Sequence, residues 1–162
     1  MRGATALDRF VSLTPAEAFA VEYWPLELYK LTLRPPEREL AGRVVVITGG
    51  ASGIGRATAY RMAQEGAHVV ILDINREGAE GVAADLTSRY GEGRGMAAPC
   101  AVTDARQVIE AFRRVVLPYG GVDIVVNNAG IAHSAPITET STADWDRLYH
   151  VQALDHPAVL QC

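Results

Sequence analysis

The chain has 162 residues, of which 49% are hydrophobic and 21% are charged, and its formal net charge is −4. This acidic balance does not favour nucleic acid as a partner, because such binding depends on neutralising phosphates with basic side chains. No apolar run reaches the roughly 20 residues that span a bilayer, and no basic-then-apolar leader opens the chain. We therefore expect a cytoplasmic protein that does not interact with membranes.

The first 41 residues differ from the rest and are expected to form a helical N-terminal extension and linker, residues 1–41. Thr-Pro-Ala-Glu at residues 14–17 has the spacing of a capping box with proline at the first helical position, which predicts a helix through residue 23. Pro25 is expected to end this helix. A second short helix over 26–31 and a stiff polar linker over 34–39 follow. An arm that packs on the sheet or on a neighbouring subunit is the alternative.

A strand, a glycine turn and a helix follow one another after this extension. The apolar run 44–47 leads into Thr-Gly-Gly-Ala-Ser-Gly-Ile-Gly at 48–55, and a helix-forming stretch begins at residue 56. A helix N-terminus presents unpaired N–H groups and partial positive charge, and glycines let a pyrophosphate approach it closely. Asp73 stands 18 positions after Gly55, at the end of a second apolar run. The sequence thus predicts a dinucleotide cradle, the alternative being a tight turn that holds no ligand.

The remaining chain alternates strand and helix patterns. The expected elements are strands over 68–73, 95–100 and 123–126, and helices near 77–89, 105–116 and 143–153. Together with the first strand they predict an α/β fold, with a parallel sheet and right-handed crossovers. The last helix spaces several apolar or large side chains to turn toward the sheet or a partner. They are Trp145, Leu148, Tyr149 and either Val151 or Gln152.

Two motifs carry a family resemblance. One is Thr-Gly-x-x-x-Gly-x-Gly at 48–55, and the other is Asn-Asn-Ala-Gly at 127–130, which follows the apolar strand that ends at residue 126. With Asp73 between them, they resemble the short-chain dehydrogenase/reductase family over roughly residues 40–153. The resemblance implies a Rossmann-like doubly wound parallel sheet of strand order 3-2-1-4, incomplete at its C-terminal half. A partial NAD-binding Rossmann domain is accordingly expected over residues 42–162.

The resemblance also implies which residues touch the cofactor. They are Gly49, Ala51, Ser52, Gly53, Ile54, Gly55, Asp73, Ile74, Val102, Asn128, Ala129 and Gly130. A carboxylate such as Asp73 accepts hydrogen bonds from a ribose 2′-hydroxyl and repels a 2′-phosphate, which favours NAD, although Arg76 stands near enough to keep NADP as the alternative. Ala101 replaces the family's usual aspartate before Val102, so adenine binding is expected to be weaker.

The family's catalytic pair, Tyr-x-x-x-Lys, does not occur in this sequence. Its only lysine is Lys30, and no tyrosine has a lysine four residues on, so no catalytic residue is assigned. The family's asparagine in the following helix is replaced by Gln152. The expectation is a truncated, NAD-dependent dehydrogenase fragment for a small hydroxy or carbonyl compound, which would act on substrate only if a C-terminal half completes it. The alternative is a non-catalytic dinucleotide-binding or interaction module.

Histidine and cysteine spacing predicts neither a metal site nor a redox motif. His150 and His156 lack the i, i+4 spacing of a helical metal pair, and His133 is read either as a solvated loop residue or as a substrate contact. Cys100 ends an expected strand and is interpreted, like Cys162, as a buried thiol. An open fourth strand predicts a homo-oligomer.

The extension carries a second resemblance. Residues 22–31 read Glu-Tyr-Trp-Pro-Leu-Glu-Leu-Tyr-Lys-Leu. This run resembles the segment that joins a class II aldolase domain to a short-chain dehydrogenase domain in bifunctional sugar-degrading proteins, such as rhamnulose-1-phosphate aldolase fused to an alcohol dehydrogenase. The resemblance implies a substrate such as lactaldehyde or a similar sugar fragment.

Overall fold

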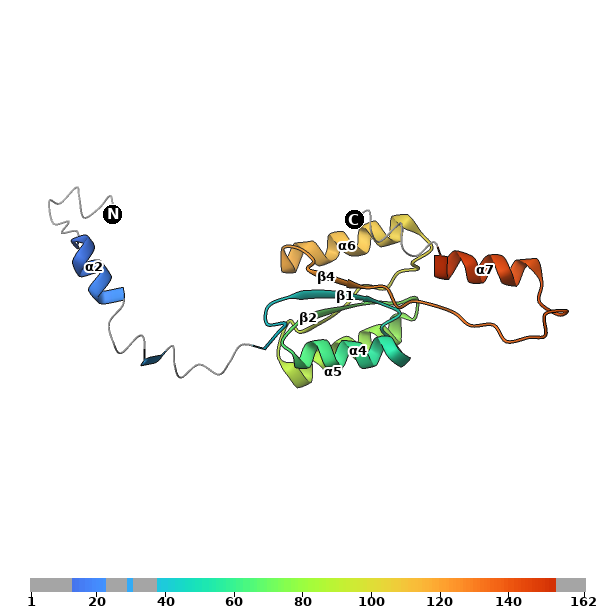
Figure 1. Cartoon of the computed structure of the whole chain (residues 1–162), viewed down its shortest axis with the longest axis horizontal. Coiled ribbons are helices and arrows are strands. Elements are labelled where there is room, and N and C mark those ends of the chain that lie inside the picture. The colour runs from blue at the N-terminus through green and yellow to red at the C-terminus, as the bar shows by residue number, and fades with distance from the viewer. Residues whose placement is uncertain (1–12, 23–28, 31–37, 154–162) are drawn as a thin grey trace. The chain divides into compact units, whose positions relative to one another are not determined.

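The computed structural model describes residues 13–22, 29–30 and 38–153 (Figure 1). The chain divides into two compact units, Met1–Glu37 and Arg38–Cys162. The boundary expected from the sequence, between residues 41 and 42, lies inside the second unit.

The first unit contains helix α2 (Pro15–Glu22), which begins with the capping box that the sequence predicts. The Thr14 N–H donates to Glu17 Oε2 at 2.8 Å, and the Glu17 N–H donates back to Thr14 Oγ1 at 3.2 Å. Each residue satisfies a backbone donor of the other, so the helix start is fixed locally. Tyr29 and Lys30 are helical, whereas the expected break at Pro25 lies outside the described residues.

The second unit is built on a parallel four-stranded sheet. Its strands are β1 (Val44–Thr48), β2 (His68–Leu72), β3 (Gly95–Ala97) and β4 (Ile124–Val126). They lie in the order β3-β2-β1-β4, and every pair is parallel. The strand order and direction expected from the family resemblance are confirmed.

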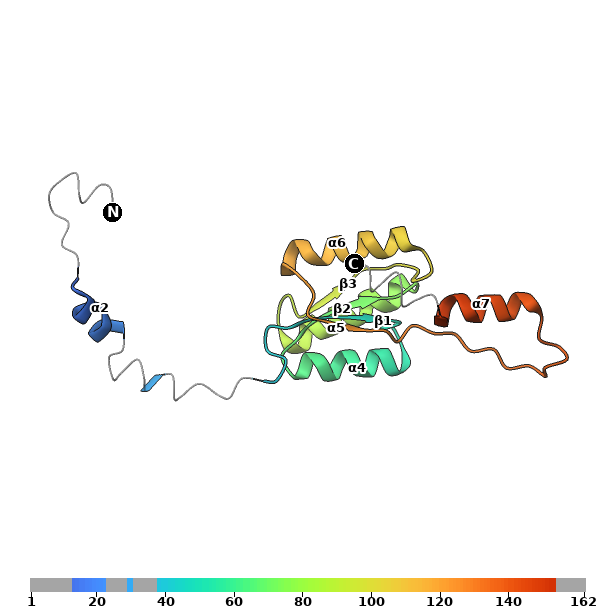
Figure 2. The same cartoon turned by 45° about the horizontal axis from the view of Figure 1, so that its top comes forward.

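Helices cover both faces of this sheet. Helices α4 (Gly53–Gln64) and α5 (Arg76–Tyr90) lie on one face, and α6 (Ala105–Tyr119) lies on the other (Figures 1 and 2). This arrangement confirms the doubly wound, Rossmann-like α/β class. Helix α7 (Thr142–Ala153) extends beyond the carboxyl end of the strands.

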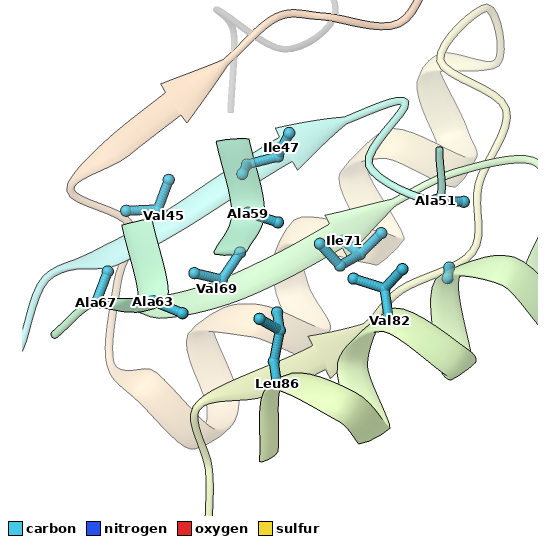
Figure 3. Close-up of a cluster of buried hydrophobic side chains, with 11 residues drawn as sticks. Val45, Ile47, Ala51, Ala59, Ala63, Ala67, Val69, Ile71, Val82 and Leu86 are labelled. Carbon is cyan, nitrogen blue, oxygen red and sulfur yellow. The ribbon is translucent and has the colours of Figure 1, made fainter. Parts of the chain in front are cut away.

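Strands β1 and β2 are buried on both faces, which explains their continuous apolar runs. Toward α4 and α5 they present Val45, Ile47, Val69 and Ile71, which pack with Ala59, Ala63, Val82 and Leu86 (Figure 3). Toward α6 they present Val44, Val46, Val70 and Leu72, which pack with Val108, Ala111, Phe112 and Val115. Strand side chains alternate between the two faces, so one short strand such as β1 contributes to both cores.

Strand β3 ends at Ala97, although the sequence predicts a strand through residue 100. Hydrogen bonds to β2 continue past its end, because the Ala98 N–H donates to Ile71 O and the Cys100 N–H donates to Asp73 O. Pro99 lies between these two donors, and its missing N–H would face away from β2, toward the outer edge of the sheet that β3 forms. Cys100 is buried as predicted, although it follows the strand. Cys162 and His156 lie outside the described residues.

Helix α7 does not turn its aromatic residues toward the sheet. Trp145 is 59% exposed and Tyr149 is 62% exposed, whereas Leu148 and Val151 are half-buried and Gln152 is exposed. The segment 127–141 places α7 beyond the ends of the strands. Most of the helix face that was expected to contact the sheet therefore has no strand to pack against. The part of the prediction that placed both aromatic residues against the sheet is therefore wrong.

Candidate dinucleotide site

The glycine turn between β1 and α4 folds back closely on itself. Gly49 has a φ of +65° and Gly53 has a φ of +52°, a conformation that side-chain-bearing residues rarely adopt. A Cβ on Gly55 would lie 2.3 Å from Gly49 O and 2.5 Å from Asn128 Nδ2. The spacing of these glycines is thus required by the shape of the turn.

Helix α4 begins at this turn without a side-chain cap. Its N-cap residue, Ser52, makes no capping hydrogen bond. By contrast, the Asn75 side chain caps α5, and the Asp104 side chain accepts from two backbone N–H groups of α6. An uncapped start leaves N–H groups and partial positive charge for an anionic ligand.

The end of β4 is fastened to the same turn. Thr48 is fully buried, and its Oγ1 accepts hydrogen bonds from the backbone N–H groups of Asn128 and Ala129, both at 2.9 Å. Asn128 Nδ2 in turn donates to Thr48 O at 3.0 Å and to Gly49 O at 3.2 Å. The Asn-Asn-Ala-Gly motif therefore supports the glycine turn from the neighbouring strand.

Asp73 fastens the turn from the other side. Its Oδ2 accepts a hydrogen bond from the Ala51 N–H at 2.9 Å, and its Oδ1 accepts one from the Asn75 N–H at 2.9 Å. Each carboxylate oxygen has a second lone pair, and the side chain is only half-buried. Asp73 can therefore hold the turn and still accept a hydrogen bond from a ribose hydroxyl.

A cavity of about 760 Å³ opens over these groups at the carboxyl ends of the strands. Ten of the twelve residues implied by the family resemblance line it: Gly49, Ser52, Gly53, Ile54, Asp73, Ile74, Val102, Asn128, Ala129 and Gly130. Ala51 belongs instead to the core beneath the turn, and Gly55 packs against Gly49. The cavity has the size and position of a small-molecule site in a doubly wound fold.

The other lining residues are not among these twelve, although the sequence already marks Ala101 as the replacement for the family's usual aspartate. Five of them end β2, follow β3 or follow the Asn-Asn-Ala-Gly motif: Leu72, Cys100, Ala101, Thr103 and Ile131. Three more come from one face of α7: Arg147, His150 and Val151. They escape sequence reasoning because the irregular segment 127–141 decides which face of α7 meets the cavity.

His133 lies in a smaller pocket of about 260 Å³ beside the cavity. Its Nε2 is 4.0 Å from Asp144 Oδ2, and 39% of its side chain is exposed. Hydrogen bonds from the Ser141 side chain and backbone hold the pKa of Asp144 below its usual value. Within the described residues no three His, Cys, Asp or Glu side chains cluster to hold a metal ion, and no helix could span a bilayer.

A parallel sheet whose first crossover starts at an uncapped, glycine-lined helix defines the dinucleotide-binding class of α/β proteins. A family model described as short chain dehydrogenase matches residues 43–155. The chain belongs to the short-chain dehydrogenase family. A second model, described as aldolase class II, second domain, matches residues 1–31.

Known relatives share this part of the family domain. The chain is 56% identical over 146 residues to the uncharacterized oxidoreductase YuxG of Bacillus subtilis (strain 168), covering 90% of this chain and 21% of that protein. It is 47% identical over 107 residues to the D-threitol dehydrogenase of Mycolicibacterium smegmatis (strain ATCC 700084 / mc(2)155), covering 66% and 40%. The chain therefore spans less than half the length of either relative.

Solved structures agree. A 3-ketoacyl-(acyl-carrier-protein) reductase from Brucella melitensis, complexed with NADH, matches with a TM-score of 0.70 and 33% identity, covering 76% of this chain and 49% of the other. A short chain dehydrogenase from Mycobacterium smegmatis matches with a TM-score of 0.72 and 32% identity, covering 81% and 56%.

Proposed function

We propose that this chain forms the NAD-binding half of a short-chain dehydrogenase that acts on a small hydroxy or carbonyl compound. The cavity that joins the uncapped start of α4 to Asp73 carries this proposal. When bound, the dinucleotide supplies the hydride acceptor or donor. The chain itself supplies backbone N–H groups for the pyrophosphate and a carboxylate for the adenosine ribose.

The preference for NAD rests on charge at the ribose end of the cavity. Asp73 would lie near a 2′-phosphate and repel it, and the nearby Arg76 is engaged with Glu80 at 3.7 Å. Ile74 and Val102 offer apolar surface for the adenine. The match to a reductase from Brucella melitensis that is complexed with NADH supports a nicotinamide dinucleotide as the cofactor.

The substrate class rests on the first 31 residues. Their match to an aldolase domain supports an arrangement in which an aldolase precedes the dehydrogenase, so that the aldehyde released by one is oxidised or reduced by the other. Lactaldehyde or a similar sugar-derived aldehyde would suit this arrangement. Proton transfer to the substrate oxygen would fall to a Tyr-x-x-x-Lys pair outside these 162 residues.

Calorimetric titration with NAD and NADP tests the proposal. We expect saturable NAD binding that is tighter than NADP binding, and we expect Asp73→Ala to weaken NAD binding at least tenfold, about 1.4 kcal/mol. Glu92→Ala is the matched control, since Glu92 is an exposed carboxylate outside the cavity lining. Tighter binding of NADP would contradict the cofactor assignment, and binding of neither would contradict the proposed function.

A further inference from the structure

Arg147 on α7 faces the same cavity as the glycine turn. It lines the 760 Å³ cavity together with Gly49, Ser52 and Gly53, and it also lines the smaller pocket around His133. Arg147 therefore borders both the cavity lined by the glycine turn and the smaller pocket.

The face of α7 that carries Arg147 is held by hydrogen bonds at both ends of the helix. Ser141 and Asp144 bond one another at the start, and Gln152 Nε2 donates to Ile131 O at 2.7 Å near the end. His150 and Val151 follow Arg147 at i+3 and i+4, so all three belong to one helical face. The cavity wall on this side is therefore a defined surface of α7.

Arg147 has no carboxylate within ion-pair distance in the part of the chain that the structure describes. Other arginines near the sheet do: Arg76 lies 3.7 Å from Glu80, Arg106 lies 3.8 Å from Asp104, and Arg114 lies 3.4 Å from Glu110. Those three also line a separate pocket, whose lining includes the carboxylates of Asp104 and Glu110. The charge of Arg147 does interact with that of Asp144, but the two form no ion pair, so the Arg147 guanidinium can still donate hydrogen bonds to an anion.

Among the described residues that line the cavity, Arg147 is the one permanently cationic side chain and Asp73 is the one carboxylate. A pyrophosphate carries two negative charges, and the start of α4 offers only about half a unit of positive charge. A guanidinium can donate two parallel hydrogen bonds to phosphate oxygens. Charge balance in the cavity therefore calls for a cation such as Arg147.

We propose that Arg147 binds the pyrophosphate of the dinucleotide from the part of the cavity wall that α7 forms. The inference rests on the proposed function and adds to it a second half of the anion site, contributed by a helix more than 90 residues along the chain from the glycine turn. Arg147 would act as a binding residue and would take no part in proton or hydride transfer.

Binding of NAD and of ADP-ribose to Arg147→Ala tests this inference by calorimetry, since ADP-ribose keeps the pyrophosphate and lacks the nicotinamide. We expect both ligands to bind Arg147→Ala at least tenfold more weakly than they bind the parent. The affinities of Arg147→Lys should lie between those of Arg147→Ala and the parent, because lysine keeps the positive charge but lacks the planar guanidinium that donates two parallel hydrogen bonds. Arg113→Ala, an exposed arginine on α6 outside the cavity lining, should bind like the parent.

Three results would overturn the inference. Equal affinities of the parent and Arg147→Ala would overturn it alone. A loss confined to NAD would place the contact at the nicotinamide half. Failure of the parent chain to bind NAD would overturn the proposed function as well, so the two failures are distinguishable.

Discussion

Gly55 and Gly81 both lie in helices, yet their surroundings are opposite. A Cβ on Gly55 would collide with the glycine turn and with Asn128, whereas a Cβ on Gly81 would meet nothing within 4 Å. A glycine-to-alanine substitution should therefore change the free energy of unfolding in opposite directions at the two positions, since only at Gly55 do neighbouring atoms leave no room for a methyl group.

We predict that Gly55→Ala lowers the free energy of unfolding by about 1–3 kcal/mol, because the turn must open to admit the methyl group. It should also weaken NAD binding, since the opened turn displaces the N–H groups of α4. Gly81→Ala should raise the free energy of unfolding by about 0.5–1 kcal/mol, because alanine loses less backbone entropy in a helix. Thermal denaturation and calorimetric titration measure both effects, and a Gly55→Ala variant as stable as the parent would contradict the steric argument.

The site residues that could be predicted from the sequence are those whose positions depend on nearby residues in the chain. Gly49, Gly53 and Asp73 lie in or next to a strand end, so strand periodicity and turn chemistry place them. Arg147 and His150 depend on the path of a 15-residue irregular segment, which no periodicity describes. The candidate site was thus predictable on the glycine-turn side and not on the α7 side.

Among the elements, α7 depends most visibly on its first turn. The Ser141 hydroxyl donates to Asp144 Oδ2 at 2.6 Å, and the Asp144 N–H donates to Ser141 Oγ at 3.2 Å. The Ser141 hydroxyl and the Ser141 N–H, which donates to the same carboxylate oxygen at 3.1 Å, keep the pKa of Asp144 below its ordinary value of about 3.9. A group whose pKa is lowered on folding stabilises the folded form above its unfolded pKa, and this contribution is lost as the pH falls through its folded pKa.

We therefore predict that the start of α7 loses helical order as the pH falls from about 5 toward 2. Backbone chemical shifts of residues 142–146, followed by NMR, measure this loss. Asp144→Asn should weaken the helix start at neutral pH and remove its pH dependence, whereas Asp146→Asn, outside the capping box, should leave both unchanged. Identical chemical shifts at pH 5 and pH 2 in the parent would count against the argument.

Element types followed from the sequence more closely than element ends. The predicted strand over 95–100 became β3 (Gly95–Ala97), although the Ala98 and Cys100 N–H groups beyond it still donate to Ile71 O and Asp73 O. The predicted helix near 105–116 extends to Tyr119, with Pro118 in its last turn and Gly120 in the left-handed conformation that ends it. The residue at which a helix or strand ends depends on hydrogen bonds to other parts of the chain, and the periodicity of apolar residues does not predict those bonds.

At the scale of the whole molecule, β4 forms an outer edge of the described sheet. It pairs with β1 on one side only, and Val125 at its centre is 37% exposed. An unpaired edge strand offers free backbone groups to another chain. Homo-oligomerisation, expected from the sequence, remains a prediction.

We predict that the 162-residue chain associates through this edge when it is prepared alone. Light scattering after size-exclusion chromatography should give a mass above that of one chain, and Val125→Lys should lower it because a charge on an edge strand disfavours pairing. Leu117→Lys is the control, since Leu117 is 86% exposed but lies on α6. A parent chain of single-chain mass would refute the prediction.

The bonds that fasten β4 to β1 also bear on the order in which the sheet closes during folding. β1 meets β2 across 24 residues of sequence, whereas Val44 and Asp123, at the entry to β4, are 79 residues apart. Closing the longer loop costs about 1 kcal/mol more in chain entropy. Hydrogen bonds at both ends of the β1–β4 pairing offset that entropic cost. At one end the Asp123 carboxylate accepts from the Val44 N–H, and at the other the Thr48 hydroxyl accepts from the N–H groups of Asn128 and Ala129. The glycine turn therefore receives its support from Asn128 only through the pairing that closes the longest loop of the sheet, so a chain with β1 and β2 already paired would still lack that support.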